Sequence, residues 1–427
     1  MLSNIHQDVE HNPSVRESWH YGFCRSGRLG LPLTQVTAKK RRSEIVSIRI
    51  VTRRILSAAG VALALASGMQ GAQAQDAIKI AVGAPLTGAL AKQGQEVANA
   101  VQLAVDEWNA KGGVLGKKIQ LVKADDGGNP QVGVAAGEKV AADVDVLGAV
   151  WGITSSTCLP VSEILQRGDM VMITPGCSNP KVTDRGMNNV ERLCARDDFQ
   201  APAAMIFAVK ELKAKKIALI DDGTAGPRGQ ADEAEKKAKE LGATTQRIVI
   251  RAGDKDFRAV LGTIAKDTDI IYSTPWAPDT ALIAKQLADV GLKAKIMGSD
   301  TLYEPVDFVQ AAGGAAEGSY VTFFVPDMKK IPAAASFVKT FEGKYGSISS
   351  YGPLAYEAAN ILIESIKKAG KADRAAVRDA MRKVNGYKGI LGQPIAFDAK
   401  GDVATQSLAV YQVKGTGFQL VKTISDK

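Results

Sequence analysis

Histidine is scarce in this sequence. All three histidines, His6, His11 and His20, lie near the start of the 427-residue chain. Imidazole is the usual general base, the usual partner of a serine nucleophile and a frequent zinc ligand. Its absence beyond residue 20 argues against a Ser-His-Asp hydrolase and a catalytic zinc site. A nucleophilic enzyme would require Ser155 or Cys177 activated by a lysine. We therefore expect no catalytic residues, no metal and no cofactor.

Long hydrophobic runs are also lacking. The apolar run ILSAAGVALALASGM at 55–69 is too short to span a membrane comfortably. It follows Arg53-Arg54 and precedes Ala72-Gln73-Ala74, an A-x-A cleavage site. A basic start, a short apolar segment and such a site are the parts of a secretory signal peptide. We predict a signal peptide at 51–74, cleavage after Ala74 and a periplasmic protein.

Residues 1–50 do not fit in front of a signal peptide. They contain the basic run 39–42 and no periodic apolar pattern. We interpret them as a non-native or mis-assigned extension, with translation beginning near Val51. N-terminal sequencing of the precursor tests this interpretation.

The chain after Ala74 is nearly balanced in charge. Residues 1–74 hold ten of the 54 Lys and Arg, four of the 45 Asp and Glu, and every histidine. The remaining 353 residues therefore carry 44 basic and 41 acidic side chains, a net charge of +3. Nucleic-acid binding loses its electrostatic basis, and we expect no nucleic-acid partner.

Cysteine is rare, and beyond residue 74 only Cys158, Cys177 and Cys194 remain. An odd number in an exported chain allows at most one disulfide. Cys158 and Cys177 can pair if adjacent strands bring them together, or they can remain free buried thiols. The sequence leaves both possibilities open.

Short β-branched runs alternate with amphipathic stretches from Ile78 onward. This alternation predicts an α/β fold with parallel sheets covered on both faces. Helices are expected at 95–110, 130–144, from 155, 201–213, 230–241, 279–290, 333–345, 354–369 and 374–384. Strand-like segments at 393–398, 407–413 and 418–422 close the pattern.

The alternation starts twice, which predicts two doubly wound lobes joined by a hinge of several crossing strands. We place the first lobe at 76–195 plus 326–396 and the second at 196–325 plus 397–427. Ligands bind beyond the carboxyl ends of parallel strands. The loops expected there are 151–157 and 173–180 in the first lobe, and 222–229, 273–278 and 298–301 in the second.

These loops carry groups that suit an α-amino acid. Ser155 begins a helix, and Ser178 lies in the rigid loop ITPGCSNP, so both offer donors to a carboxylate. The Gly176 carbonyl and the Asp300 carboxylate can accept from an ammonium group. Simpler readings remain: Ser155 as a helix N-cap, Ser178 as a turn residue and Asp300 as a local cap.

Several motifs together resemble one family. The chain is similar, over about Ile78 to Lys422, to the solute-binding proteins of branched-chain amino-acid ABC transporters. These are the leucine/isoleucine/valine-binding type of the type I periplasmic binding proteins. The similarity lies in IKIAVGAPLTG, NAKGGVLGKKIQLVKADD, SSTCLPVSEIL, MVMITPGCSNPKVTDRG, ERLCARDDFQAP, KDF and IMGSD.

The resemblance implies a binding role for the residues that match the family motifs. Ser155 and Ser178 would hold the ligand carboxylate, while Gly176 and Asp300 would hold its ammonium. Trp276 would close over the ligand and Tyr351 would line the side-chain pocket, with Cys177 contributing from the ITPGCSNP loop. The resemblance also implies two lobes that close on the ligand, a membrane permease as partner and a monomer.

The chain departs from the family at two loops. Aromatic residues that the family often carries are missing from 91–94 and from 223–229, where Gly226 stands near the expected place. Gln93 can hydrogen-bond a polar ligand at the first loop, or lie in solvent. We therefore expect an amino acid of the branched-chain type or a close relative. The alternative ligands are an amide, urea, or an aromatic or dicarboxylic acid.

Overall fold

A parallel five-stranded sheet organises the first half of the fold. The computed structural model describes residues 77–325 and 327–425, so the predicted extension at 1–50 and signal peptide at 51–74 lie outside the described residues. The strand order is β2-β1-β3-β4-β5, and the pairs are parallel. The strands are β1 (Ile78–Ala84), β2 (Ile119–Asp125), β3 (Val146–Trp151), β4 (Val171–Thr174) and β5 (Val190–Arg192).

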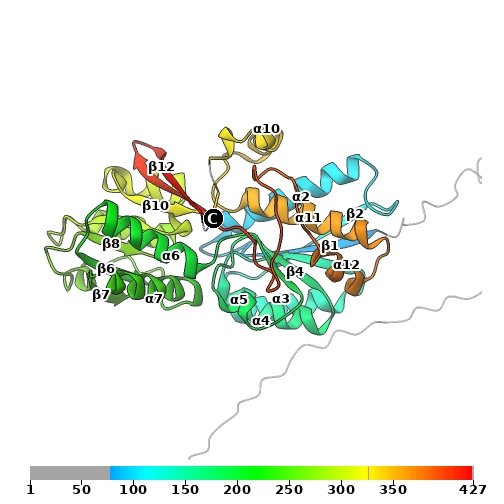
Figure 1. The fold of residues 1–427 in the computed structure, drawn as a ribbon, viewed down its shortest axis with the longest axis horizontal. Helices are drawn as coiled ribbons and strands as arrows, with labels where there is room; N and C mark the ends of the chain where they lie inside the picture. Colours follow the sequence, from blue (N-terminus) through cyan, green and yellow to red (C-terminus); the bar gives the residue numbers. More distant parts are fainter. Residues whose placement is uncertain (1–76, 326, 426–427) are drawn as a thin grey trace, which may run out of the picture. The chain divides into compact units, whose positions relative to one another are not determined.

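Helices cover both faces of this sheet, and its central strands β1, β3 and β4 are therefore buried. Figure 1 shows α2 and α11 on one side of β1, and α3 and α4 on the other. The helices of this half are α2 (Ala91–Ala110), α3 (Pro130–Ala142), α4 (Ser155–Arg167), α5 (Lys181–Asp184), α10 (Ala335–Tyr345), α11 (Gly352–Ala369) and α12 (Arg374–Met381).

A seven-stranded sheet organises the second half, with the order β12-β11-β10-β9-β8-β6-β7. The strands from β6 to β10 pair in parallel, whereas β11 and β12 pair antiparallel. The strands are β6 (Lys216–Asp221), β7 (Thr244–Val249), β8 (Ile270–Ser273), β9 (Lys295–Gly298), β10 (Tyr320–Phe323), β11 (Ser407–Lys414) and β12 (Gly417–Ser425).

The second half also contains α-helices, π-helical segments and short 3-10 turns. The α-helices are α6 (Asp197–Ile206), α7 (Ala225–Glu240), α8 (Arg258–Leu261) and α9 (Ala277–Gln286). One π-helical segment, η1 (Phe207–Glu211), continues α6, and a second, η3 (Pro305–Gln310), follows the 3-10 turn η2 (Asp300–Leu302). The remaining 3-10 turns are η4 (Gly313–Ala316), η5 (Met328–Lys330) and η6 (Pro332–Ala334).

The α/β fold class expected from the alternating pattern is confirmed, but several details differ, among them the antiparallel pairing of β11 and β12 in the second sheet and the first residues of α6 and α7. The helix expected from residue 95 begins at Ala91, and the segment at 393–398 forms isolated bridges rather than a strand. Ile395 pairs with Tyr387, and Phe397 pairs with Val403. Pro394 has no N–H to donate, so a continuous ladder is disfavoured there. The lobe boundaries given above stay predictions.

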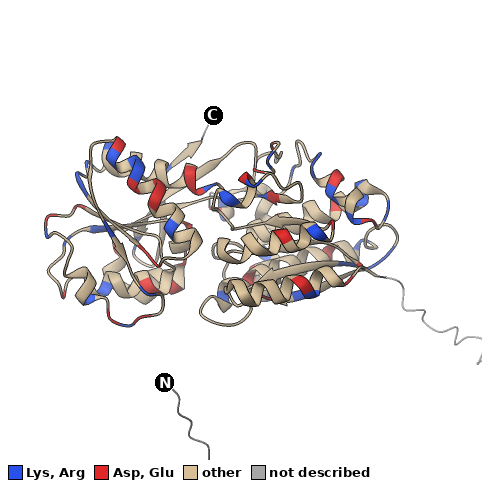
Figure 2. Cartoon of the chain, turned by 90° about the horizontal axis from the view of Figure 1, so that it is seen from below, with Lys and Arg blue, Asp and Glu red and all other residues tan. Residues whose placement is uncertain are grey.

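Charge is spread evenly over the described chain. Figure 2 shows basic and acidic residues interspersed along the helices and loops of both halves. Among residues 77–325 and 327–425, no helix is long and apolar enough to cross a membrane.

Candidate functional site

A cavity of about 480 Å³ lies where the carboxyl ends of strands from both sheets meet. We call it the central cavity. Six of the eight residues predicted as ligand contacts line it: Ser155, Gly176, Ser178, Trp276, Asp300 and Tyr351. Cys177 and Gln93 are not among its lining residues. The strand-end loops predicted from the sequence thus line this cavity, whereas Cys177 and Gln93, which were expected on other grounds, do not.

The first wall begins at the N-terminus of α4. Ser155 is the first residue of the helix, and the N-cap is Thr154, whose side chain makes no capping hydrogen bond. The Ser155 hydroxyl accepts a hydrogen bond from the Asn179 backbone N–H at 3.2 Å, so its own proton can be donated elsewhere. The positive end of the helix dipole lies at the same position. This wall therefore favours an anionic group.

The ITPGCSNP loop forms the rest of that wall and is fixed from several directions. The Thr174 hydroxyl accepts from the Cys177 backbone N–H at 3.0 Å. The buried Arg192 guanidinium donates to the carbonyl oxygens of Cys177 at 3.1 Å and Asn179 at 2.8 Å. The loop is rigid because its polar groups are anchored to β4 and β5.

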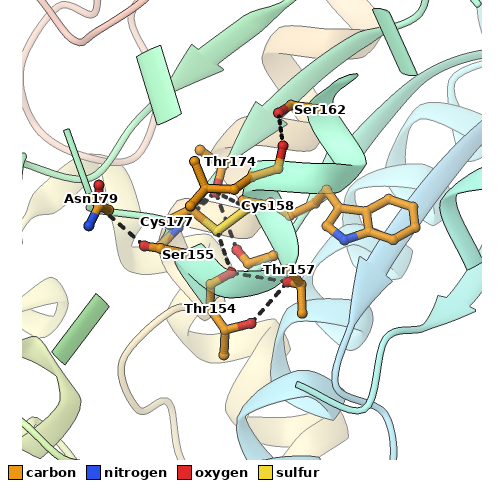
Figure 3. The surroundings of a disulfide bond; sticks show 12 residues. Thr154, Ser155, Thr157, Cys158, Ser162, Thr174, Cys177 and Asn179 are labelled. Carbon is orange, nitrogen blue, oxygen red and sulfur yellow. Dashed lines mark hydrogen bonds between the residues drawn. A yellow bond between two sulfur atoms is a disulfide. The ribbon is translucent and has the colours of Figure 1, made fainter. Parts of the chain in front are cut away.

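A disulfide links this loop to α4. Cys158 and Cys177 are bonded, as Figure 3 shows, while Cys194 is free and buried. This resolves the alternatives that the sequence left open. The bond joins the first turns of the helix that begins at Ser155 to the loop that carries Ser178. The side chain of Cys177 is therefore directed into the protein, which explains why it does not line the cavity.

A glycine is required at position 176, because the Tyr351 ring lies close to the backbone there. A β-carbon at this position would lie 2.8 Å from the ring of Tyr351. Tyr351 is the N-cap residue of α11 and is buried. The glycine therefore allows the aromatic ring to pack directly on the loop, where it also reaches the opposite wall.

Asp300 provides the charged group of the second wall. It is 2% exposed and begins η2, just after β9. The Tyr351 hydroxyl donates to Asp300 Oδ2 at 2.6 Å, and Gln230 Nε2 donates to Oδ1 at 3.0 Å. Burial raises the pKa of Asp300 above its ordinary value, while these two donors oppose the rise. Trp276, the N-cap residue of α9, lies beside them with its ring 6.3 Å from that of Tyr351.

Gln93 lies elsewhere than expected. It is 1% exposed, and its Nε2 donates to Asp307 Oδ2 at 3.1 Å. Because α2 begins at Ala91, Gln93 falls in its first turn and faces η3 rather than the central cavity. Both readings from the sequence, contact with a ligand and exposure to solvent, therefore need correction.

Contacts between the two halves surround the cavity. Besides the bonds of Tyr351 and Gln93, Asn179 Nδ2 donates to the Ala225 carbonyl at 2.9 Å. The Ser350 hydroxyl donates to the buried Glu304 carboxylate. These hydrogen bonds join the two halves of the fold.

Sequence reasoning missed the far end of the cavity. Small residues after β1, β2 and β7 line it there, together with polar residues after β6 and β7 and in the first turn of α9: Ala89, Gly127, Gly128, Gly253, Asp222, Thr224, Lys255 and Asp279. Only the loop at 222–229 was expected. The strand-end rule also applies to β1, β2 and β7, so extending it to every strand would have found the others. Gln230 was missed because α7 begins five residues earlier than expected.

Nothing in the described residues suggests a metal site. Within 77–325 and 327–425, no group of three or more His, Cys, Asp or Glu side chains is placed to hold a metal ion.

The sequence and fold define a family. Residues 77–418 match the model of the periplasmic binding protein family, so the chain belongs to that family. The Leu/Ile/Val-binding protein BraC3 of Rhizobium johnstonii is 35% identical over 339 residues, which cover 78% of this chain and 91% of the relative. Leu/Ile/Val-binding protein homolog 2 of Brucella abortus is 34% identical and covers 83% and 94%.

Solved structures agree. The leucine-binding protein LivK of Thermotoga maritima superposes with a TM-score of 0.76 at 30% identity, covering 81% of this chain and 98% of that one. LivJ of Streptococcus pneumoniae, crystallised with isoleucine, shares the fold with a TM-score of 0.74 at 23% identity. The resemblance to the substrate-binding proteins of branched-chain amino-acid ABC transporters is therefore confirmed. Proteins of this family are periplasmic and serve as binding components.

Proposed function

We propose that this protein is the solute-binding component of an ABC importer. It binds an amino acid of the branched-chain type, or a close relative, in the central cavity and delivers it to a membrane permease. One observation carries the proposal: hydroxyl donors at a helix N-terminus face a buried carboxylate across a single cavity. Such walls complement the two charges of a zwitterion.

Each wall has a distinct role in this proposal. Ser155 and Ser178 donate to the ligand carboxylate, with the α4 dipole behind them. Asp300 and the Gly176 carbonyl accept from the ammonium group. Each charge-assisted hydrogen bond is worth about 1.5–3 kcal/mol. Trp276 then closes over the ligand, and Tyr351 lines the pocket for its side chain.

Closure follows from the placement of these residues in both halves. A ligand that contacts α4 and η2 together binds best when the halves are together, so it shifts the population toward the closed form. Tyr351 already joins the walls by its 2.6 Å hydrogen bond to Asp300. The bound ligand would add further contacts between the two walls.

We also propose that the protein binds its ligand without catalysing a reaction. The disulfide of Cys177 removes that thiol as a nucleophile. Ser155 would need an activating base, and its hydroxyl instead accepts from a backbone N–H. Turnover of an ester or amide substrate by the wild type, and loss of that turnover in Ser155→Ala, would contradict this proposal.

The polar far end of the cavity supports a second candidate ligand class. Asp222, Thr224, Lys255 and Asp279 line that end, and no aromatic residue stands at 223–229. An amide or another ligand with a polar terminus would use these groups, whereas leucine would leave them in water.

Two measurements test the proposal. Native mass spectrometry of the purified protein identifies a co-purifying small molecule. A thermal-shift panel of L-leucine, L-isoleucine, L-valine, aliphatic amides, urea, benzoate and dicarboxylic acids ranks the classes, because a ligand of the folded state raises Tm. The proposal fails if no amino acid or analogue raises Tm. N-terminal sequencing of the periplasmic fraction tests cleavage after Ala74, and light scattering tests the monomer.

A further inference from the structure

A second carboxylic acid, Asp197, lies behind the proposed ammonium subsite. It begins α6 and is 0% exposed. Its backbone N–H donates to the Ser178 carbonyl oxygen at 3.0 Å. On its other side is α7, where a β-carbon at Gly229 would lie 3.6 Å from Asp197 Oδ2. The acid thus lies between the loop that carries Ser178 and the helix that carries Gln230, the partner of Asp300.

The carboxyl group of Asp197 is unsatisfied. Neither of its oxygens has a hydrogen-bond partner among the described residues, although buried carboxylates normally have several. Burial and the nearby Asp300 raise the pKa of Asp197 to about 7. The side chains of Ser178 and Gln230 lie close, outside hydrogen-bonding geometry, and offset only part of this rise.

Among the described residues, the cation that acts on Asp197 is already paired. Arg192 of β5 is the charged group of opposite sign, and it is paired with the buried Asp402 at 2.6 Å. Tyr272 of β8, Tyr351 of α11 and Cys194 are neutral, because burial and the acids raise each pKa well above its ordinary value. The groups near the pair include Ser178, Arg192, Cys194, Gln200, Gln230, Tyr272, Tyr351 and Asp402.

We propose that Asp197 is a positioning residue of the ammonium subsite, which holds a proton in the empty protein and releases it to solvent when a ligand ammonium binds beside Asp300. The O–H bond of the carboxyl group breaks, its electron pair stays on the oxygen and the proton passes to the buffer. The ligand supplies the positive charge that the site lacks, and this charge favours ionisation of both acids. The inference rests on the proposed function.

Proton release makes affinity depend on pH in a defined direction. Below the pKa of Asp197 the ligand must displace a proton, so affinity falls by up to about tenfold for each pH unit lost. Above it, the acid is already ionised and affinity is constant. Binding should therefore strengthen from about pH 5 to pH 7 and then level off.

Calorimetry with L-leucine in two buffers of different ionisation enthalpy counts the protons released. We expect about one proton at pH 6 and almost none at pH 8.5. Asp197→Asn should still bind but release no proton, and its affinity at pH 8 should be lower than that of the wild type at pH 6, because the asparagine side chain cannot ionise when the ligand binds. Asp256→Asn is the control, because Asp256 is an acid with a pKa of about 2 that lies on an exposed loop.

The outcomes separate this inference from the proposed function. Leucine binding without proton release overturns the inference and leaves the function standing, whereas a failure of every amino acid to bind overturns the function. Selective ¹³C labelling of aspartate carboxyl groups allows their titration to be followed in the ligand-free wild type. This test needs neither the variant nor the ligand. An aspartate that titrates near pH 7 supports the inference, and the absence of any titration above pH 6 overturns it.

Discussion

Replacing Asp300 by asparagine should weaken ligand binding while the fold is retained. Asparagine keeps the size of the side chain and one oxygen that can accept from Tyr351 or Gln230. It removes a buried charge, so the cost of one lost hydrogen bond, about 1 kcal/mol, is offset by easier burial. We expect a change in Tm of only a few degrees.

The effect on binding should be larger. The variant loses the anionic partner of the ligand ammonium, worth about 1.5–3 kcal/mol, so Kd should rise about 10- to 150-fold. Isothermal titration calorimetry with L-leucine measures this change, and circular dichroism checks the fold. Ser155→Ala removes a neutral donor to the carboxylate and should raise Kd about tenfold.

A result that leaves both affinities unchanged would refute the assignment of the two walls. Asp256→Asn serves as the matched control, because it removes an exposed aspartate that does not line the cavity. A variant that lost binding together with its circular dichroism spectrum would be replaced by Asp300→Glu. That variant keeps the charge and should bind better than Asp300→Asn.

Three further perturbations have defined outcomes. Gly176→Ala places a methyl group 2.8 Å from the Tyr351 ring, so it should cost about 1–3 kcal/mol of unfolding free energy, measured by urea denaturation. Gly314→Ala is the control, because a β-carbon there meets no atom within 4 Å and the φ angle of Gly314 is not positive. The double variant Cys158→Ser/Cys177→Ser opens a loop with a sequence separation of 19, and it should lower that free energy by about 3 kcal/mol; no change in Tm would show that the bond is dispensable. Burial raises the pKa of Glu304 from 4.5 to about 8, so its contribution to stability is present at low pH and is lost as the pH rises through 8. Glu304→Gln should therefore reduce the fall in Tm between pH 5.5 and pH 8.5, and an unaltered pH profile would contradict this reasoning.

The sequence predicted those parts of the site that depend on the order of strands. Ser155, Ser178 and Asp300 each follow an apolar run, and parallel strands bring such positions to one edge. The motif resemblance added Trp276 and Tyr351. These residues line the cavity because their positions depend on local patterns and on a shared topology.

Side-chain direction and long-range pairing escaped prediction. Gln93 could not be placed, because its direction depends on the residue at which α2 begins. The Cys158–Cys177 bond depends on a contact between α4 and the loop after β4, which no local pattern reveals. Asp197 escaped prediction, since its burial against α7 arises only in the folded chain.

The chain passes more than once between the two halves of the fold, and this limits the order in which the halves can fold. The first sheet is covered by α11 and α12, which are synthesised after most of the second sheet, and the second sheet is completed by β11 and β12. Neither half can thus acquire its full core early in translation. A nascent chain released before Ser407 would leave β10 as an unprotected edge, and such a truncation should be recovered as insoluble protein.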